Sequence, residues 1–264
     1  MKPSFLTAAE AVARFIEPGA SLGVGGMHLT AAPMAVVDEV VRRQIPIGRL
    51  ITGPSASIQA DLPIGAGLVG ELLSPYVGFE HLGLAPAFRR AVESGQLDVL
   101  ECDEGSMTHA LYAGAGGLPF IPCPPGVELT DVPSVNPGMY RRTVDPFDGL
   151  EKVVVPAVRP DVSVIACLES DHEGNVAFGR FPFTDRLLAL AGRRLIVQVE
   201  RVVEQITPGE SLPAFLIAAV VVAPGGCRPT ASPGLYPADE EAVRAWLAAA
   251  RTSDGARAYI EELS

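Results

Sequence analysis

Apolar positions along the chain follow two alternating spacings. Short continuous apolar runs, which are typical of buried β-strands, are separated by segments in which apolar residues recur every three or four positions, as on one face of a helix. The runs predict strands over residues 21–25, 45–52, 97–101, 152–156, 162–168, 194–199 and 217–222. The helical spacing predicts helices over residues 7–16, 33–43, 86–94, 106–115, 184–191 and 238–250. Strands that alternate with helices form parallel βαβ units, so the pattern predicts an α/β fold.

Local signals mark the ends of the first elements. Thr7 and Glu10 have the spacing of a capping box, in which a hydroxyl and a carboxylate each satisfy a free backbone N–H at the start of a helix. Pro18 and Gly19 end this helix before the first long strand. Pro33 suits the first turn of the next helix, because its fixed φ is already helical.

Residues 119–146 are rich in proline and follow neither spacing. A connection of this length without structure is unusual inside a compact domain and is generally functional or part of an interface. It would also suit a boundary between two lobes. Because the strands predicted on its two sides look alike, we interpret residues 1–264 as a single domain with an irregular loop around 119–146.

Composition and charge exclude several classes of partner. The chain of 264 residues carries a formal net charge of −11, and its arginine pairs are scattered, so no surface for nucleic acid is expected. The apolar run over residues 212–224 is shorter than the roughly 20 residues that a membrane-spanning helix needs. Met1, Lys2 and Pro3 do not begin a secretory signal. We therefore expect a cytoplasmic protein without a membrane partner.

The four cysteines, Cys102, Cys123, Cys167 and Cys227, are far apart in the sequence, and the four histidines do not cluster with them. This spacing predicts no metal site. Disulfides are not expected in a reducing cytosol, so we interpret the cysteines as small residues in or near the core.

The strongest local candidate for a binding site is the turn that follows the first long strand, where Gly25 and Gly26 are adjacent. Glycines tolerate positive φ, and near a helix N-terminus their N–H groups are suited to bind a carboxylate or the oxygen of a thioester. An ordinary tight turn is the alternative interpretation. From Gly23 the spacing is G-x-G-G, which lacks the third glycine of the dinucleotide-binding motif.

This turn resembles the amino-terminal signature of the A subunit of class I CoA-transferases of the glutaconate type. The other matching segments, in the order expected of that family, are 61–67 (DLPIGAG), 103–105 (DEG), 118–122 (LPFIP), 160–162 (PDV), 171–175 (DHEGN), 199–201 (VER), 223–226 (APGG) and 234–236 (GLY). The resemblance implies a three-layer α/β fold and a B subunit of similar fold, with the active site in the cleft between them.

The family's nucleophile is a glutamate of the B subunit, so the resemblance assigns this chain a supporting role in shaping the acyl pocket. Coenzyme A enters as part of the substrate, and no tightly bound cofactor is implied. The complex would be a heterodimer or a heterotetramer.

Departures from the family pattern bear on the reaction. Met27 stands where transferases have an aromatic residue, and Ala31 and Ala32 stand where glutaconate-type subunits often have a basic one. The distal carboxylate of the substrate would then lack a cationic partner, with His28 and Thr30 as the nearby polar groups. Loss of carbon dioxide is easier from a carboxylate in an apolar pocket, so this change favours decarboxylation.

Four further residues are candidates with simpler alternatives. Glu104 resembles a glutamate thought to act in catalysis in a related branch that opens a steroid-derived ring, but a carboxylate at a helix start can also cap the helix or interact with its dipole. Ser55 and Ser57 are placed to bind a substrate carboxylate, although their turn is also a common one. His28 alternatively completes the hydrogen bonding of its own turn.

Taken together, the sequence resembles the A subunit of a branch that decarboxylates 3-methylglutaconyl-CoA to 3,3-dimethylacrylyl-CoA, on a bacterial route to isovaleryl-CoA. Glu104 is the catalytic candidate; the substrate-binding candidates are Gly25, Gly26, Met27, His28, Thr30, Ser55 and Ser57. The first alternative is a glutaconate-type subunit that moves CoA between carboxylic acids. The second is a non-catalytic subunit that binds CoA esters or acts as a scaffold.

Overall fold

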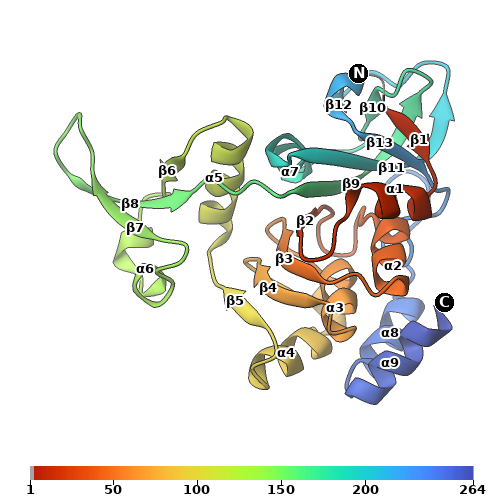
Figure 1. Cartoon of the computed structure of the whole chain (residues 1–264), viewed down its shortest axis with the longest axis horizontal. Helices are drawn as coiled ribbons and strands as arrows, with labels where there is room; N and C mark the ends of the chain where they lie inside the picture. Colours follow the sequence, from red (N-terminus) through yellow and green to blue (C-terminus); the bar gives the residue numbers. More distant parts are fainter. Residues whose placement is uncertain (1–2, 264) are drawn as a thin grey trace.

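The computed structural model describes residues 3–263 (Figure 1). Met1 and Lys2, for which the sequence predicts no secretory signal, lie outside the described residues. In the described part of the chain, no helix combines the length and the apolar character needed to cross a membrane.

A ten-stranded sheet forms the centre of the molecule. Its main path, in spatial order, is β1 (Ser4–Leu6), β13 (Ala219–Val222), β11 (Arg194–Val203), β9 (Val162–Asp171), β2 (Ser21–Val24), β3 (Ile47–Thr52), β4 (Val69–Leu73) and β5 (Asp98–Leu100). Neighbours along this path are parallel. The short strands β10 (Val176–Ala177) and β12 (Ser211–Leu212) pair antiparallel beside β9. The predicted α/β fold with a mainly parallel sheet is confirmed.

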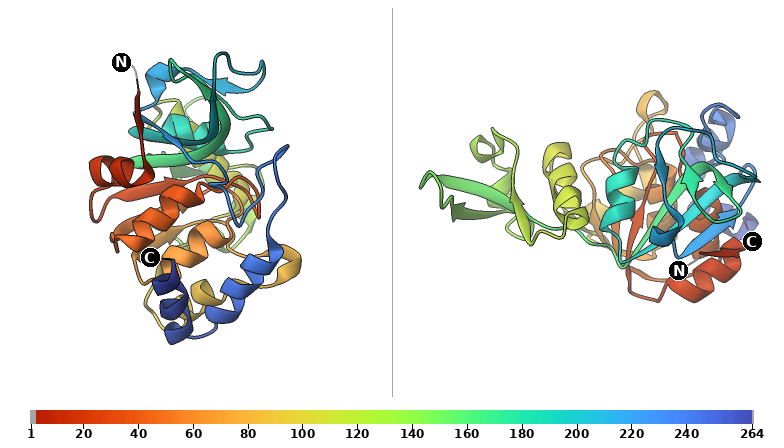
Figure 2. Two further views of the ribbon diagram at one scale, coloured as in Figure 1. Left: turned by 90° about the vertical axis from the view of Figure 1, so that its right-hand side faces the viewer. Right: turned by 90° about the horizontal axis from the view of Figure 1, so that it is seen from above.

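Helices cover both faces of this sheet and give three layers. One face carries α1 (Ala8–Phe15), α2 (Met34–Arg42), α3 (Ile58–Gly65), α4 (Pro86–Glu93), α8 (Glu240–Ala249) and α9 (Ser253–Glu262). The other carries α5 (Glu104–Ala115) and α7 (Asp185–Ala191). Successive residues of one strand enter different cores, as Val164 and Ile165 of β9 do, because side chains alternate across a strand. Figure 2 shows the sheet between its helical layers.

Helix boundaries follow the local signals closely. The capping box forms as predicted: Glu10 donates its backbone N–H to the Thr7 hydroxyl, and its carboxylate accepts from the Thr7 backbone at 2.9 Å. Pro33 is the N-cap of α2 rather than part of its first turn. The prediction missed β1, α3, β4 and α9.

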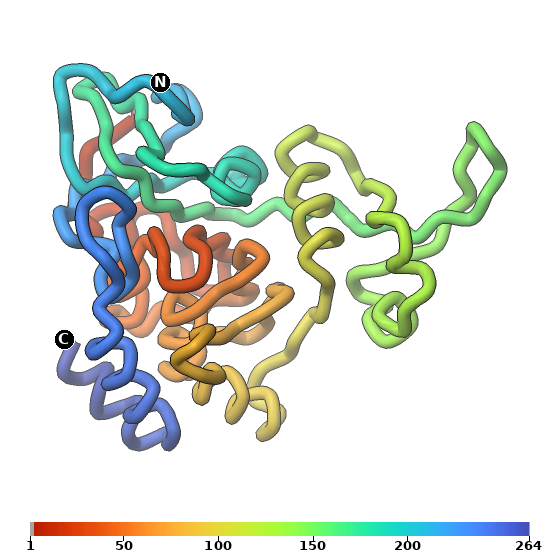
Figure 3. Tube along the Cα trace, turned by 180° about the vertical axis from the view of Figure 1, so that it is seen from behind, coloured from red at the N-terminus to blue at the C-terminus, as the bar shows by residue number. Residues whose placement is uncertain are grey.

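The segment predicted as an irregular loop contains regular structure. It carries β6 (Phe120–Pro122), η2 (Val127–Leu129), α6 (Val132–Val135) and β7 (Arg141–Val144). The strand predicted at residues 152–156 exists as β8 (Glu151–Pro156), but it pairs antiparallel with β6 and β7 in a separate sheet, not in the parallel one. The expectation of an irregular loop is wrong here, because prolines interrupt the periodicity without preventing a hairpin. We call residues 119–156 the arm; it extends away from the body beyond α5 (Figures 1 and 3).

Candidate functional site

The predicted site residues gather at one edge of the sheet. β2, β3, β4 and β5 are parallel neighbours, so the turns that follow them leave from the same edge. Ligand sites of open α/β sheets lie at the carboxyl ends of the strands. Gly26 and His28 follow β2, Ser55 follows β3, Glu80 opens η1 (Glu80–Leu82) after β4, and Glu104 follows β5.

The amides of the paired glycines are already bonded within the chain. Gly25 donates its N–H to the carbonyl of Val164 at 2.8 Å, and Gly26 donates to Oδ1 of Asp185 at 2.9 Å. Both glycines are buried. The expectation that these N–H groups are free to bind an oxyanion therefore does not hold in this structure. An internal carboxylate occupies the position that we expected a ligand to take.

His28 lies at the centre of a polar cluster with residues from the neighbouring turns. Its Nδ1 is 2.6 Å from Oε1 of Glu80 and 2.8 Å from Oγ of Ser55. The hydroxyl of Ser57 donates to the His28 carbonyl at 2.6 Å. His28 itself has a positive φ of 51°. A proton on Nδ1 beside the Glu80 carboxylate would leave Nε2 as an acceptor, and the pair then orients the ring.

Ser55 and Ser57 form the buried side of this cluster through their hydrogen bonds to His28. Their relative exposures are 2% and 0%, whereas the His28 side chain is 40% exposed. The structure thus brings the predicted residues His28, Ser55 and Ser57 together, but it contradicts the expectation that the two serine hydroxyls face a substrate carboxylate. Both hydroxyls are buried because they bond to groups of this chain. Sequence reasoning missed Glu80, because its turn carries no motif and only the packing of η1 against the β2 turn brings it to His28.

A mainly apolar hollow of about 490 Å³ opens beside this cluster. It is lined by Met27, His28, Thr30, Arg180, Phe181, Phe183 and Pro233. Three of these, Met27, His28 and Thr30, were substrate-binding candidates. The two phenylalanines lie edge to face, with ring centroids 5.4 Å apart, and both are exposed. Such a hollow, with few polar groups, is suited to a small acyl chain.

The hollow contains a positive group that sequence reasoning did not find. Arg180 lines it and forms an ion pair with Asp185, and the side chains of both are nearly fully buried. Burial raises the pKa of Asp185, and the Arg180 guanidinium opposes that shift. The expectation that no cation lies near the paired glycines is therefore wrong, although the Asp185 carboxylate offsets the charge. No sequence motif predicts that Arg180 lies near the β2 turn, because the pairing of β9 with β2 in the sheet brings this distant part of the chain there.

Glu104 is the first residue of α5, and its side chain is exposed. It does not cap the helix: Asp103 does, by accepting the Ser106 N–H at 2.9 Å. Tyr140 of the arm donates its hydroxyl to Oδ2 of the same carboxylate at 3.1 Å. Partial burial would raise the pKa of Asp103, but hydrogen bonds from Ser106 and Tyr140 hold that pKa below its usual value. Glu104 is therefore not the helix cap, whereas its position in the first turn of α5 keeps the alternative of an interaction with the helix dipole.

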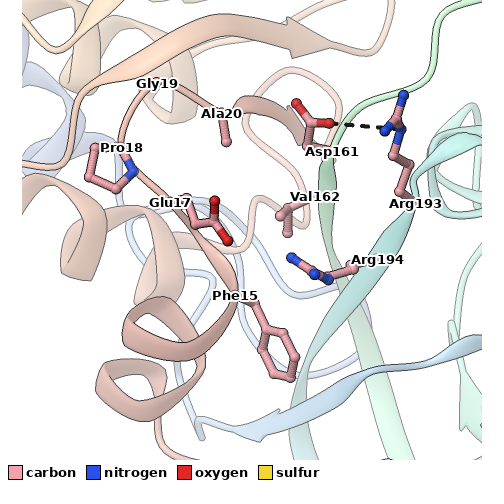
Figure 4. A pocket seen from close by; sticks show the side chains of 9 residues that line it. All are labelled: Phe15, Glu17, Pro18, Gly19, Ala20, Asp161, Val162, Arg193 and Arg194. Carbon is pink, nitrogen blue, oxygen red and sulfur yellow. Dashed lines mark ion pairs between the residues drawn. The ribbon is translucent and has the colours of Figure 1, made fainter.

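A larger hollow of about 630 Å³ lies at the opposite edge of the sheet, near the amino ends of β2, β9 and β11 (Figure 4). Here Asp161 accepts hydrogen bonds from the backbone and hydroxyl of Ser21 and lies 3.8 Å from Arg193. Asp161 therefore joins two neighbouring strands. Two acidic residues, Glu17 and Asp161, line this hollow, and Asp161 is committed to the Ser21 backbone and hydroxyl.

The cysteines behave as predicted. All four are free, and Cys102, Cys167 and Cys227 are buried. Burial raises the pKa of the Cys102 and Cys227 thiols to about 12, so neither is a thiolate at neutral pH. Among residues 3–263, no group of three or more His, Cys, Asp or Glu side chains could hold a metal ion.

Fold, motifs and site define one class of protein. The family model described as Coenzyme A transferase matches residues 5–223, and the chain therefore belongs to this family. Within it the chain is A-subunit-like: it is 35% identical to the A subunit of the 3-oxoadipate CoA-transferase of Pseudomonas knackmussii, over 97% of this chain and 92% of that one. The family resemblance inferred from the motifs is confirmed.

The chain is also similar to a solved decarboxylase and to an uncharacterised archaeal protein. The solved structure of the decarboxylase AibA/AibB has a TM-score of 0.90 and 34% identity, and the match covers 100% of this chain and 99% of that one. An uncharacterised protein of Archaeoglobus fulgidus is 33% identical over 99% of this chain, which spans 59% of that relative's length.

Proposed function

We propose that this chain is the A subunit of a two-subunit decarboxylase that converts 3-methylglutaconyl-CoA to 3,3-dimethylacrylyl-CoA. The observation that carries the proposal is the end-to-end similarity to the decarboxylase AibA/AibB. A homologous B subunit would complete the active-site cleft as a heterodimer or heterotetramer, and coenzyme A would enter only as part of the substrate.

The hollow beside His28 supports this reaction. When the carbon–carbon bond to the distal carboxylate breaks, carbon dioxide leaves and the electron pair moves through the double bond to the thioester oxygen as a dienolate. A proton must then return to the γ carbon. Met27, Phe181 and Phe183 would desolvate the carboxylate, which favours its loss. His28, which contacts Glu80 and Ser55 and lines the same hollow, would hold that proton.

Glu104 is the proposed catalytic carboxylate. It does not line the hollow in this chain. Its exposed position at the same sheet edge suits a cleft that a partner subunit closes. The amides of Gly25 and Gly26 are not proposed as donors to the thioester oxygen, because Val164 and Asp185 accept their hydrogen bonds.

CoA transfer between carboxylic acids is the second candidate function. The observation that favours it is the 35% identity to the A subunit of a 3-oxoadipate CoA-transferase. Arg180 at the hollow also favours it, because a cation could hold a substrate carboxylate ionised. A glutamate at the nucleophile position of the B subunit would be needed for this reaction.

The deciding experiment uses the complex. The chain is co-expressed with a candidate B subunit from the same organism, and 3-methylglutaconyl-CoA is supplied with and without acetate while products are followed by mass spectrometry. We expect a CoA ester lighter by carbon dioxide, formed at the same rate without acetate. Acetyl-CoA and free diacid, formed only with acetate, would establish the transferase instead.

A non-catalytic scaffold would give a third result. The complex would then turn over no CoA ester, including any ester that raises its thermal unfolding temperature by binding.

A further inference from the structure

The arm presents a set of large apolar side chains to solvent. Phe147, at the tip of the β7–β8 hairpin, is 98% exposed, and Leu129 on η2 is 86% exposed. The others in this set are Phe120, Val135, Val144 and Leu150. These side chains come from several elements of one protruding segment, and large exposed apolar groups on such a segment are typical of a region that another protein covers.

The root of the arm is fixed to the body by buried side chains and hydrogen bonds. Met139 and Tyr140 are 1% and 2% exposed and pack into the same core as α5 and α7. Asn136 accepts the backbone N–H of Glu101 at 3.1 Å, and Tyr140 bonds to Asp103. The arm therefore leaves the body from a root that is part of the core.

The size of this surface fits a part of a stable interface. An aromatic side chain buries about 150–250 Å². Phe147 is almost fully exposed, whereas Phe120 is about half-buried and the four aliphatic side chains are partly so, so the set supplies a part of the roughly 800 Å² that each partner contributes to a standard protein–protein interface.

We propose that this apolar surface of the arm docks the B subunit. The proposal rests on the proposed function, which requires such a partner. The root of the arm bonds to Glu101 and Asp103, the residues that lead into Glu104. A partner seated on the arm would therefore stand next to the catalytic candidate and close the cleft on that side. A second copy of this chain would bring no new subunit to Glu104.

The test compares two exposed apolar positions. The Phe147→Ser, Leu150→Ser double variant is co-expressed with the B-like subunit, and the dissociation constant of the purified complex is measured by sedimentation. Because a single hot-spot residue costs about 2 kcal/mol or more, we expect the affinity to fall at least about 30-fold even if only one of the two side chains is a hot spot. Phe215→Ser is the matched control, since Phe215 is 72% exposed but lies outside the arm. We expect it to leave the affinity unchanged.

Folding is monitored separately. Circular dichroism and the thermal midpoint of the chain alone should not change in either variant, because the side chains are exposed. Leu129→Ser, on a different element of the arm, should weaken the complex in the same direction.

An affinity unchanged by both arm variants would overturn the proposal, as would an equal loss in Phe215→Ser. Self-association of the chain alone that the arm variants abolish would assign the surface to a second copy and also overturn it. Failure of the proposed function has a different readout: the two subunits would bind through the arm, yet the complex would release no carbon dioxide.

Discussion

Gly26 has a φ of +93°, and a Cβ built on it would lie 2.8 Å from Cα and 2.9 Å from the amide nitrogen of Ala32. Gly26→Ala should therefore strain the fold itself. The positive φ costs roughly 1–2 kcal/mol for a residue with a side chain, and the overlap with backbone adds to it. We expect a loss of stability greater than about 2 kcal/mol in urea unfolding, with activity falling in parallel.

Gly19→Ala is the matched control for this variant. Gly19 has a φ of +83°, but no atom lies within 4 Å of the added Cβ, so only the conformational cost applies. A Gly26→Ala protein as stable as Gly19→Ala but devoid of activity would contradict this account, and would restore a direct role for the Gly26 amide.

Glu104→Gln should separate catalysis from stability. The side chain is exposed and Asp103 caps the helix, so the free energy of unfolding should change by no more than about 1 kcal/mol, the size of a helix-dipole interaction. If the carboxylate moves a proton during the reaction, kcat of the complex should fall about 10²–10⁴-fold. Steady-state kinetics and thermal unfolding measure the two effects.

Glu101→Gln provides the comparison, because Glu101 is also exposed and precedes the same helix. Full turnover in Glu104→Gln, or an equal loss in Glu101→Gln, would remove Glu104 from the catalytic proposal.

Only part of the site could be predicted at the level of residues. His28, Ser55 and Ser57 were each identified from their own turns, and the parallel pairing of β2 with β3 brings those turns to one edge of the sheet. Arg180 and Glu80 could not be found, because long-range packing alone places them beside the β2 turn. The buried bonds of the Gly26 amide and the two serines were equally invisible, since sequence spacing does not show which donors are already satisfied.

Among the elements, a buried acid joins the carboxy-terminal helices to α3 and α4, in addition to hydrogen bonds from Arg42 and Arg90 and to apolar packing. Asp61 of α3 accepts the Phe88 N–H at 2.7 Å and the Trp246 indole N–H at 2.8 Å, and so connects α3, α4 and α8. Burial raises the pKa of Asp61 to about 6, against the lowering effect of these two hydrogen bonds.

This raised pKa predicts how stability depends on pH. The folded state holds the Asp61 proton more tightly than the unfolded state, whose pKa is near 3.9, so the contribution to stability is largest below about pH 4. It should decline as the pH rises from about 4 to about 6, by roughly 3 kcal/mol at most, and stay constant above that range. Urea unfolding across this pH range measures it.

Comparison with Asp61→Asn isolates this residue from the other carboxyl groups. The variant should be less stable throughout, because its amide cannot accept from both donors, but the difference from the native chain should shrink as the pH rises towards 6. A difference that does not change with pH would show that Asp61 does not titrate in this range.

Each element that sequence reasoning missed or misplaced has its own physical cause. α3 is buried on nearly every side, its polar residues Gln59 and Asp61 included, and it contains Pro63, so it lacks the exposed polar face by which helices are recognised. β8 was placed in the wrong sheet because an apolar run does not encode its pairing partner. The parallel βαβ core was predictable because its strands are buried on both faces and its helices keep one apolar stripe.

At the scale of the whole molecule, the proposed site is an open hollow at one edge of the sheet, and this chain forms only one side of it. His28, Glu80 and the hollow face outward, and Glu104 stands exposed on the same edge. A homologous partner seated on the arm would supply the missing wall. The separate chain is therefore expected to bind CoA esters weakly and to show turnover only in the complex.

The bond between Gly26 and Asp185 spans 159 residues of sequence, and β2 lies between β3 and β9 in the sheet. During synthesis the first four strands after α1 are therefore made long before the strand that covers the open side of β2. An unpaired strand edge is a template for association with other chains. The turn at Gly26 can form its bond to Asp185 only after α7 has been synthesised. A chain that stalls or is cut before β9 would therefore expose the unpaired edge of β2, and its site would be incomplete.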